Sequence, residues 1–91
     1  MSSDSVLIAA AGQVSCELGE EVVILDVEGG TYFGLQGVGA RVWEPLDRPV
    51  AVSEIERVVL EEYDVEPERC RWDLVAFLSG LVTRGLVEVQ A

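Results

Sequence analysis

The chain has 91 residues, of which 49% are hydrophobic, so we expect one compact domain spanning residues 1–91. Its 17 acidic residues stand against 6 basic ones, all of them arginine, and the formal net charge is −11. This balance argues against nucleic acid and against an anionic membrane as partners, because proteins bind both through cationic side chains. The acids either solvate the surface or attract a cationic partner, and the composition leaves both open.

The start of the chain shows no targeting signal. No cationic region precedes the short apolar run Val6–Ala11, and no apolar segment approaches the roughly 20 residues that a membrane helix needs. We therefore expect a cytoplasmic protein. Cys16 and Cys70 lie far apart and form no metal-type pair, so we expect both to be small apolar packing residues in a reducing compartment.

The first part of the chain has the pattern of strands. Val6–Ala9 and Val14–Leu18 are short extended segments, and Glu21–Val27 is long and rich in β-branched residues. Glu28-Gly29-Gly30 is typical of a hairpin turn, since glycine accepts positive φ, and Thr31–Leu35 is the returning strand. The sequence therefore predicts a small antiparallel sheet within the first 35 residues.

The long strand has two apolar faces. Val23, Leu25 and Val27 alternate onto one face, and the other face carries Val22, Ile24 and Asp26. An antiparallel sheet with one wet face shows a cleaner alternation of apolar and polar residues. We therefore expect the second face to be covered, either by another element of the chain or by a partner.

Two helices are predicted in the middle of the chain. The first runs from about Val38 to Glu44, because Pro45 discourages continuation. Ser53 and Glu56 have the spacing of a capping box, in which each side chain reaches a backbone amide of the first turn. The buried stripe of this second helix is Ile55, Val58, Val59 and Tyr63.

A third helix begins at Pro67, which suits the first turn of a helix, and ends near Gly85. Its inward stripe is Leu74, Phe77, Leu78, Leu81 and Val82. Leu86–Val89 alternates again and is predicted to be a final short strand. The predicted fold class is α+β, similar to a winged helix-turn-helix, with an N-terminal three-stranded antiparallel sheet followed by three helices.

The residues needed for catalysis are missing. Without histidine the chain lacks the commonest general base and metal ligand, and we expect no enzyme activity, no metal and no cofactor. Gly34, Gly37 and Gly39 precede a helix but lack the surrounding sequence of a nucleotide-binding loop. A winged-helix transcription factor and an acidic regulatory or antitoxin-like module remain as alternatives, the first disfavoured by the charge.

The order and spacing of several motifs resemble the PqqD-like family. The motifs are Tyr32-x-x-Leu35, Gly39-Ala40, Val42-Trp43-Glu44, Leu46, Val52, Ile55, Leu60, Tyr63-Asp64, Asp73-Leu74, Phe77-Leu78, Leu81 and Gly85-Leu86. The resemblance covers about residues 20–89. Gln36 stands where the family usually has asparagine, which is a mild departure.

The resemblance implies a recognition element for ribosomally made, modified peptides. A chain of this size and acidity is most similar to the B1-type protein of lasso-peptide biosynthesis. That protein binds the leader of a precursor peptide and has no catalysis of its own. Its partners are a cysteine-protease-like leader peptidase of the B2 type and a lasso cyclase. The alternative branch is the peptide chaperone that serves a radical-SAM enzyme.

In this family the leader adds as a strand to the third strand of the sheet and lies against the third helix. Strand addition draws affinity from main-chain hydrogen bonds and specificity from pockets for alternate side chains. On the strands and hairpin the candidate residues are Leu25, Val27, Gly30, Thr31, Tyr32, Phe33 and Gly34. On the third helix they are Arg69, Trp72, Asp73, Ala76, Phe77 and Gly80.

Three questions stay open in the sequence. Either Tyr32 or Phe33 faces the peptide, because the two alternate across the strand. Trp72 is either exposed or packed on the sheet. Asp73 pairs either with a cation of the leader or with Arg69 one turn earlier.

Overall fold

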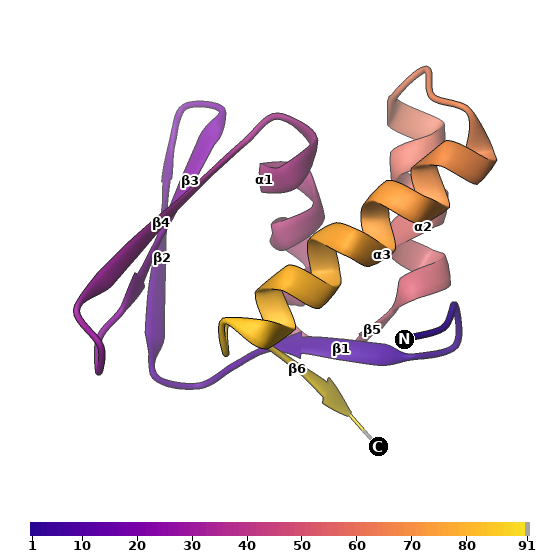
Figure 1. The fold of residues 1–91 in the computed structure, drawn as a ribbon. Coiled ribbons are helices and arrows are strands. Elements are labelled where there is room, and N and C mark those ends of the chain that lie inside the picture. The colour runs from indigo at the N-terminus through magenta and orange to yellow at the C-terminus, as the bar shows by residue number, and fades with distance from the viewer. Residues whose placement is uncertain (91) are drawn as a thin grey trace.

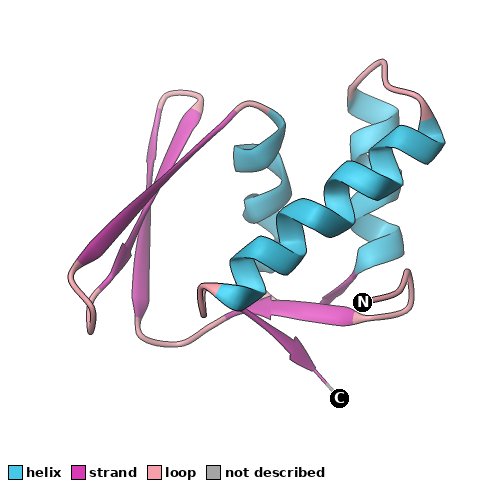
Figure 2. Cartoon of the chain, in the orientation of Figure 1, coloured by secondary structure: helices cyan, strands magenta, loops and turns pink. Residues whose placement is uncertain are grey.

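The computed structural model describes residues 1–90, which form six strands and a group of helices (Figure 1). The strands are β1 (Val6–Ala9), β2 (Gln13–Leu18), β3 (Glu21–Asp26), β4 (Thr31–Gln36), β5 (Val50–Ala51) and β6 (Val87–Gln90). The helices are α1 (Val38–Trp43), the short 3-10 helix η1 (Glu44–Asp47), α2 (Val52–Glu62) and α3 (Pro67–Thr83). Figure 2 shows that strands dominate the first part of the chain and helices the second. The predicted α+β class, with a three-stranded antiparallel sheet followed by three helices, is confirmed.

The strands belong to two separate antiparallel sheets. One has the order β2-β3-β4, which leaves β4 at an edge, and the other has the order β5-β1-β6. The prediction that all of the first 35 residues share one sheet is therefore wrong for β1. Val6 lies opposite Ala51 on one side and Gln90 on the other, so β1 finds its partners far along the chain. The short strand β5 was not predicted, while the final strand is confirmed as β6.

The hydrophobic core lies between the helices and the inner faces of both sheets. It contains Leu7 from β1, Ile24 from β3 and Leu78 from α3, each fully buried. The remaining buried residues of this cluster are Val22, Ala40, Val42, Trp43, Leu46, Val52, Ile55, Val59, Cys70, Leu74, Leu81, Leu86 and Val87. Burial of these side chains is the main term that stabilises the fold.

The start of α2 differs from the prediction. No side-chain cap is made there, so the expected capping box of Ser53 and Glu56 is wrong. The N-terminal segment supplies the missing acceptors instead: the carbonyl of Ser5 accepts from the Val52 amide at 2.9 Å, and that of Ser3 accepts from the Ser53 amide at 3.0 Å. Glu56 is buried, and its carboxylate pairs with Arg71 of α3 at 3.3 Å.

Helix α3 begins and ends close to the residues that the sequence predicts. Pro67 occupies the first turn, where its missing N–H costs no hydrogen bond. Gly85 has φ +75°, and the amides of Gly85 and Leu86 donate to the carbonyls of Val82 and Leu81 at 3.0 Å each. This arrangement satisfies two of the orphan carbonyls at the end of the helix. No helix within residues 1–90 has the length and apolar character that crossing a membrane requires.

Candidate functional site

One edge of β4 is free within the described residues. β4 pairs only with β3 among residues 1–90, and its sequence from Thr31 to Gln36 contains neither proline nor charge. Such an edge offers unpaired N–H and C=O groups to another extended chain. Arg84, at the C-terminal end of α3, lies 5.6 Å from the centroid of the Phe33 ring. The end of α3 is therefore next to β4.

The register of the sheet decides how Tyr32 and Phe33 face. Phe33 lies opposite Ile24, which is fully buried, so Phe33 points to the side of the sheet that the helices cover. Its side chain is half-buried against the core. Tyr32 lies opposite Leu25 on the other side of the sheet and is 70% exposed. An extended peptide added to β4 would place alternate side chains beside each of these rings.

One side of α3 borders the space next to β4. Phe77, Gly80 and Arg84 follow at spacings of three and four residues and so share one face of the helix. Gly80 is exposed, and a Cβ placed on it would meet no atom within 4 Å. Ala76 is exposed one turn before it. The small residues leave room here for another backbone to approach α3.

Further along this face, Arg69 and Asp73 pair with each other. The Arg69 guanidinium donates to the Asp73 carboxylate at 3.2 Å, and both side chains are exposed. Of the two alternatives for Asp73, the structure contains the pair within the helix. An exposed pair of this kind stabilises a helix by only about 0.2–0.5 kcal/mol. A ligand can therefore compete for either side chain at little cost.

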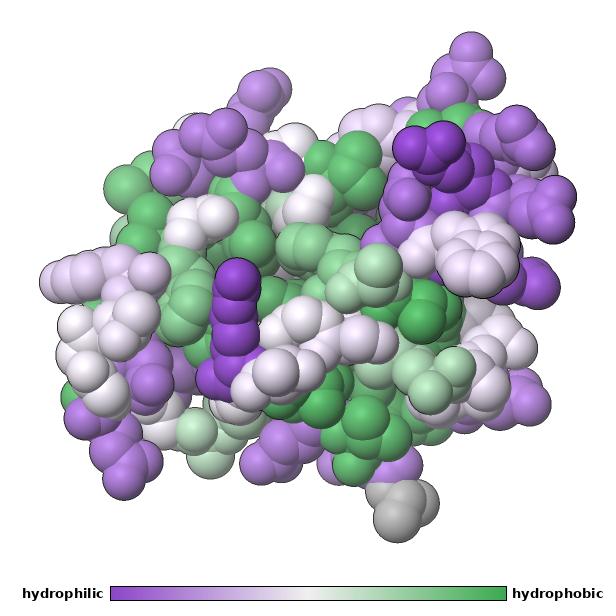
Figure 3. Space-filling model, viewed as in Figure 1, coloured by the Kyte–Doolittle hydropathy of each residue, from purple (hydrophilic) through white to green (hydrophobic). Residues whose placement is uncertain are grey.

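A mainly apolar pocket of about 300 Å³ lies between α1 and α3. It is lined by Val38, Gly39, Val42, Val59, Val65, Arg69, Cys70, Asp73, Leu74 and Phe77. A Cβ on Gly39 would lie 3.3 Å from the Phe77 ring, so glycine at this position allows α1 and α3 to approach closely. Figure 3 shows apolar surface between the sheet and α3, with hydrophilic residues around it.

The structure thus divides the predicted binding residues. Arg69, Asp73 and Phe77 line the pocket between α1 and α3. Phe33 lies under Arg84 at the end of α3, and Ala76 and Gly80 are exposed on that helix; we call the surface from the β4 edge along α3 to this pocket the groove. Thr31 shares the side of Phe33, and Gly34 shares that of Tyr32.

Four predicted residues lie elsewhere. Leu25 faces the opposite side of the sheet, and Val27 and Gly30 belong to the exposed hairpin turn. Trp72 is 74% exposed, a half-turn away from the buried side of α3. It does not pack on the sheet, so the exposed alternative holds.

Sequence reasoning missed Val38, Gly39 and Val65 as lining residues of the pocket. Val38 begins α1, is 39% exposed, and lines the pocket where α1 lies beside α3. The pair Gly37 and Gly39 was the available signal, because glycines at a helix start often mark a close approach of two backbones.

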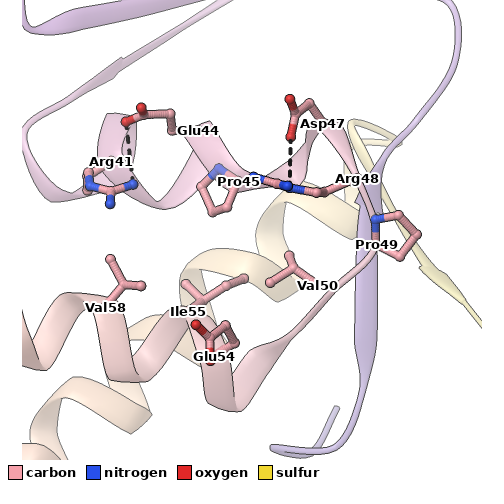
Figure 4. A pocket seen from close by; sticks show the side chains of 10 residues that line it. All are labelled: Arg41, Glu44, Pro45, Asp47, Arg48, Pro49, Val50, Glu54, Ile55 and Val58. Carbon is pink, nitrogen blue, oxygen red and sulfur yellow. Dashed lines mark hydrogen bonds and ion pairs between the residues drawn. The ribbon is translucent and has the colours of Figure 1, made fainter.

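A second hollow, of about 480 Å³, lies between η1 and α2 (Figure 4). Its charged groups are already paired: Arg41 with Glu44 at 3.4 Å, Arg48 with Asp47 at 3.8 Å, and Glu54 with Arg57 outside the hollow. None of the predicted binding residues lines it. We therefore place the candidate site at β4 and α3.

The pocket contains one thiol, that of Cys70. Burial raises the pKa of the Cys70 thiol, and Glu56 and Asp73 raise it further, which disfavours a reactive thiolate at this pocket. Within residues 1–90, no three His, Cys, Asp or Glu side chains are grouped as a metal site would require. Cys16, expected to be a packing residue, is exposed on β2, so that prediction is wrong because its face of the sheet is uncovered.

The fold and the groove together define a class: a small α+β domain with a free strand edge beside a helix. The sequence pattern of one family, described as coenzyme PQQ synthesis protein D (PqqD), matches residues 21–87. The chain belongs to the PqqD family.

Two solved structures share this fold closely. One, described as TbiB1 in complex with the TbiA(beta) leader peptide, is 36% identical, with a TM-score of 0.85, and the match covers 92% of this chain and 98% of that one. The other, a lasso peptide synthetase B1 complexed with the leader peptide, is 20% identical, with a TM-score of 0.80, and the match covers 90% and 96% of the two chains. A comparison with curated protein sequences gives no match.

Proposed function

We propose that this protein binds the leader region of a ribosomally made precursor peptide and delivers it to a leader peptidase in lasso-peptide biosynthesis. The leader adds as a strand to the free edge of β4 and packs its alternate side chains against Phe33 and α3. The protein has no catalysis of its own and works in the cytoplasm. The observation that carries the proposal is the uncharged, unpaired β4 edge beside α3, in a chain 36% identical to a B1 protein solved with its leader.

The energetics favour this mode of binding. A disordered leader costs about 2–5 kcal/mol to order, and main-chain hydrogen bonds alone are worth only about 0.5–1.5 kcal/mol each. The apolar pocket of Val38, Val65 and Phe77 supplies the remaining contact area. Small residues at Ala76 and Gly80 let the peptide backbone approach α3.

The test is a fluorescence-anisotropy titration of the leader peptide encoded beside this gene. We expect saturable binding at tens of micromolar or tighter, and no saturation in that range would refute the proposal. Ala76→Arg should weaken binding at least tenfold, because the new side chain occupies the groove. Ser53→Arg, which adds the same charge at an exposed position of α2, is the matched control and should bind as the natural protein does.

Strand addition has a sharper test. Two leader peptides are made, each N-methylated at alternate residues of the segment that pairs with β4, but in opposite phase. In an edge strand only every second amide points toward the partner. One peptide should lose binding and the other should keep it; equal affinities would contradict strand addition.

The PqqD match also keeps the second candidate open, a peptide chaperone for a radical-SAM enzyme. The two differ in the enzyme that the peptide-loaded protein meets. Leader removal by the neighbouring peptidase, accelerated by this protein, supports the lasso assignment. The DNA-binding alternative gains no support from α3, because Arg69 and Arg71 pair with the carboxylates of Asp73 and Glu56.

A further inference from the structure

The outer face of the β2-β3-β4 sheet is an apolar surface that the leader-binding groove does not use. We define this outer face by its cross-strand rows: Val14, Leu25 and Tyr32; Cys16, Val23 and Gly34; and Leu18, Glu21 and Gln36. The helices cover the opposite face, and no element within residues 1–90 covers this one (Figure 1). Val14 and Leu18 are 58% and 60% exposed. Clustered apolar side chains of this kind mark an interaction site more often than single exposed ones do.

The charge around this sheet has one sign. Residues 13–36 contain Glu17, Glu20, Glu21, Asp26 and Glu28 but no arginine, since all six arginines follow residue 40. None of these five acids forms an ion pair within the described chain. Outside the sheet, Arg41, Arg48, Arg57, Arg69 and Arg71 all pair with carboxylates, so unpaired acids there stand beside paired ones, whereas the sheet has no arginine at all. Glu17 and Asp26 lie opposite Val22 and Thr31 in rows of the inner face, whereas Glu21 lies on the outer face and Glu20 and Glu28 lie in the turns beside it. The outer face therefore has an apolar centre and an acidic border of Glu20, Glu21 and Glu28 without an arginine partner.

We infer that the outer face docks the peptidase that acts on the bound leader, through a surface that is apolar at its centre and basic at its rim. The inference rests on the proposed function and adds the place and the chemistry of the partner contact. A second copy of this chain does not fit, because it would bring another formal charge of −11 and the same acidic border against this one. An anionic membrane is disfavoured for the same reason.

The position of this face suits such a partner. β4 belongs to both surfaces: its edge and Phe33 border the leader groove, while Tyr32 lies on the outer face. A protein docked on the outer face would sit beside the added strand and touch those leader side chains that point away from α3. The enzyme would thereby be held next to its substrate, without competing with the leader for the groove.

The experiment measures peptidase binding and leader binding on the same variants. Val14→Thr with Leu18→Thr removes apolar surface from β2, keeps the strand preference, and leaves β4 and α3 intact. We expect the dissociation constant for the peptidase, measured by calorimetry, to rise at least tenfold, while the leader affinity stays within twofold. Val89→Thr, an exposed apolar residue of β6 in the other sheet, is the matched control and should change neither.

The charge complementarity is tested separately. Glu20→Lys with Glu28→Lys reverses two border charges and should weaken peptidase binding at least fivefold, with a smaller salt dependence. Asp4→Lys with Glu88→Lys changes the net charge by the same amount at exposed positions outside this sheet and is the control. Unchanged peptidase affinity in both surface variants overturns the inference, as does failure of the natural protein to bind the peptidase. So does a concentration-dependent dimer in light scattering that the Val14→Thr, Leu18→Thr variant abolishes.

The outcomes separate this inference from the proposed function. Loss of leader binding by the natural protein would remove the function itself. Normal leader binding and normal leader cleavage, with both surface variants behaving as the natural protein does, would leave the function standing and remove only the docking surface.

Discussion

The β2-β3-β4 sheet and the helical region, residues 38–90, differ in how far their apolar side chains are buried and in how their charged side chains are paired. In the helical region Leu78 is fully buried and five of the six arginines are ion-paired. In the sheet Leu18 is 60% exposed and the acids have no arginine partner. The helical region contributes most of the buried core, whereas the sheet leaves one face and one edge uncovered within the described residues.

The arrangement explains how so small a protein combines stability with binding. A domain of this size buries only about 60–65% of the surface that its unfolded chain exposes, so it has little stability to spare. The core is concentrated where helices and both sheets meet, with Leu7, Ile24 and Leu78 at its centre. The free edge of β4 and the outer face then remain open without drawing on that core.

Equivalent truncations in the two regions give the largest contrast. Leu78→Ala should lower the free energy of unfolding by about 2–5 kcal/mol, because it leaves a cavity in a fully packed site. Leu18→Ala removes the same atoms from an exposed site and should cost no more than about 0.5 kcal/mol. Urea denaturation measures both; similar losses would show that the sheet is part of the stabilising core.

The second largest change in the free energy of unfolding is expected at Gly37, the residue that connects the sheet to the helical region. Gly37 connects β4 to α1 with φ +58° and ψ −127°, a conformation that a residue with a Cβ adopts only under strain. Gly37→Ala should lower the free energy of unfolding by about 1–3 kcal/mol. Gly80→Ala has favourable φ and provides the comparison in the same denaturation series. A Gly37→Ala protein as stable as the natural one would contradict strain at this residue.

At Gly80, substitutions should affect leader binding without lowering the stability of the fold. A Cβ at this position meets no atom within 4 Å, and alanine prefers a helix interior to glycine by about 0.5–1 kcal/mol. Gly80→Ala should therefore stabilise the protein by that amount. Gly80→Arg should also fold normally but weaken leader binding at least tenfold in the anisotropy assay. Binding unaffected by arginine here would exclude α3 as a wall of the groove.

The smallest effect concerns the ion pairs that tie the helices together. The Arg41 guanidinium, donating to the carboxylate of Glu62 at 2.8 Å, holds the pKa of Glu62 below its ordinary value of 4.5. A lowered pKa in the folded state contributes stability above about pH 4.5, and this contribution is lost as the pH falls through the folded value.

Glu62→Gln should therefore lower Tm at pH 7 by no more than about 2 °C, since both side chains are partly exposed. The difference from the natural protein should shrink as the pH falls below 4.5 and disappear once the pH is below the folded-state pKa, where the carboxylate is protonated in both states. Thermal unfolding followed by circular dichroism across this pH range checks the sign. A difference that grows on acidification would show that the carboxylate does not act through this pair.

The sequence by itself determined the local elements of this protein and the family to which it belongs. Strand alternation, the hairpin glycines, Pro67 and Gly85 act over a few residues, and the structure confirms each element that they predicted. The spacing of the motifs from Tyr32 to Leu86 likewise indicates the PqqD family, whose pattern matches residues 21–87.

The tertiary structure alone decided which surfaces are covered. In the folded protein β1 belongs to a second sheet, and carbonyls of Ser3 and Ser5, not a capping box, accept hydrogen bonds from the start of α2. Phe33 faces the helices, and Tyr32 faces away from them. The tertiary structure also left Cys16 and the rest of the outer face uncovered. The physical reason is that a residue's neighbours along the chain set its backbone conformation, whereas its burial depends on partners such as β6 and α3 that lie far away in sequence.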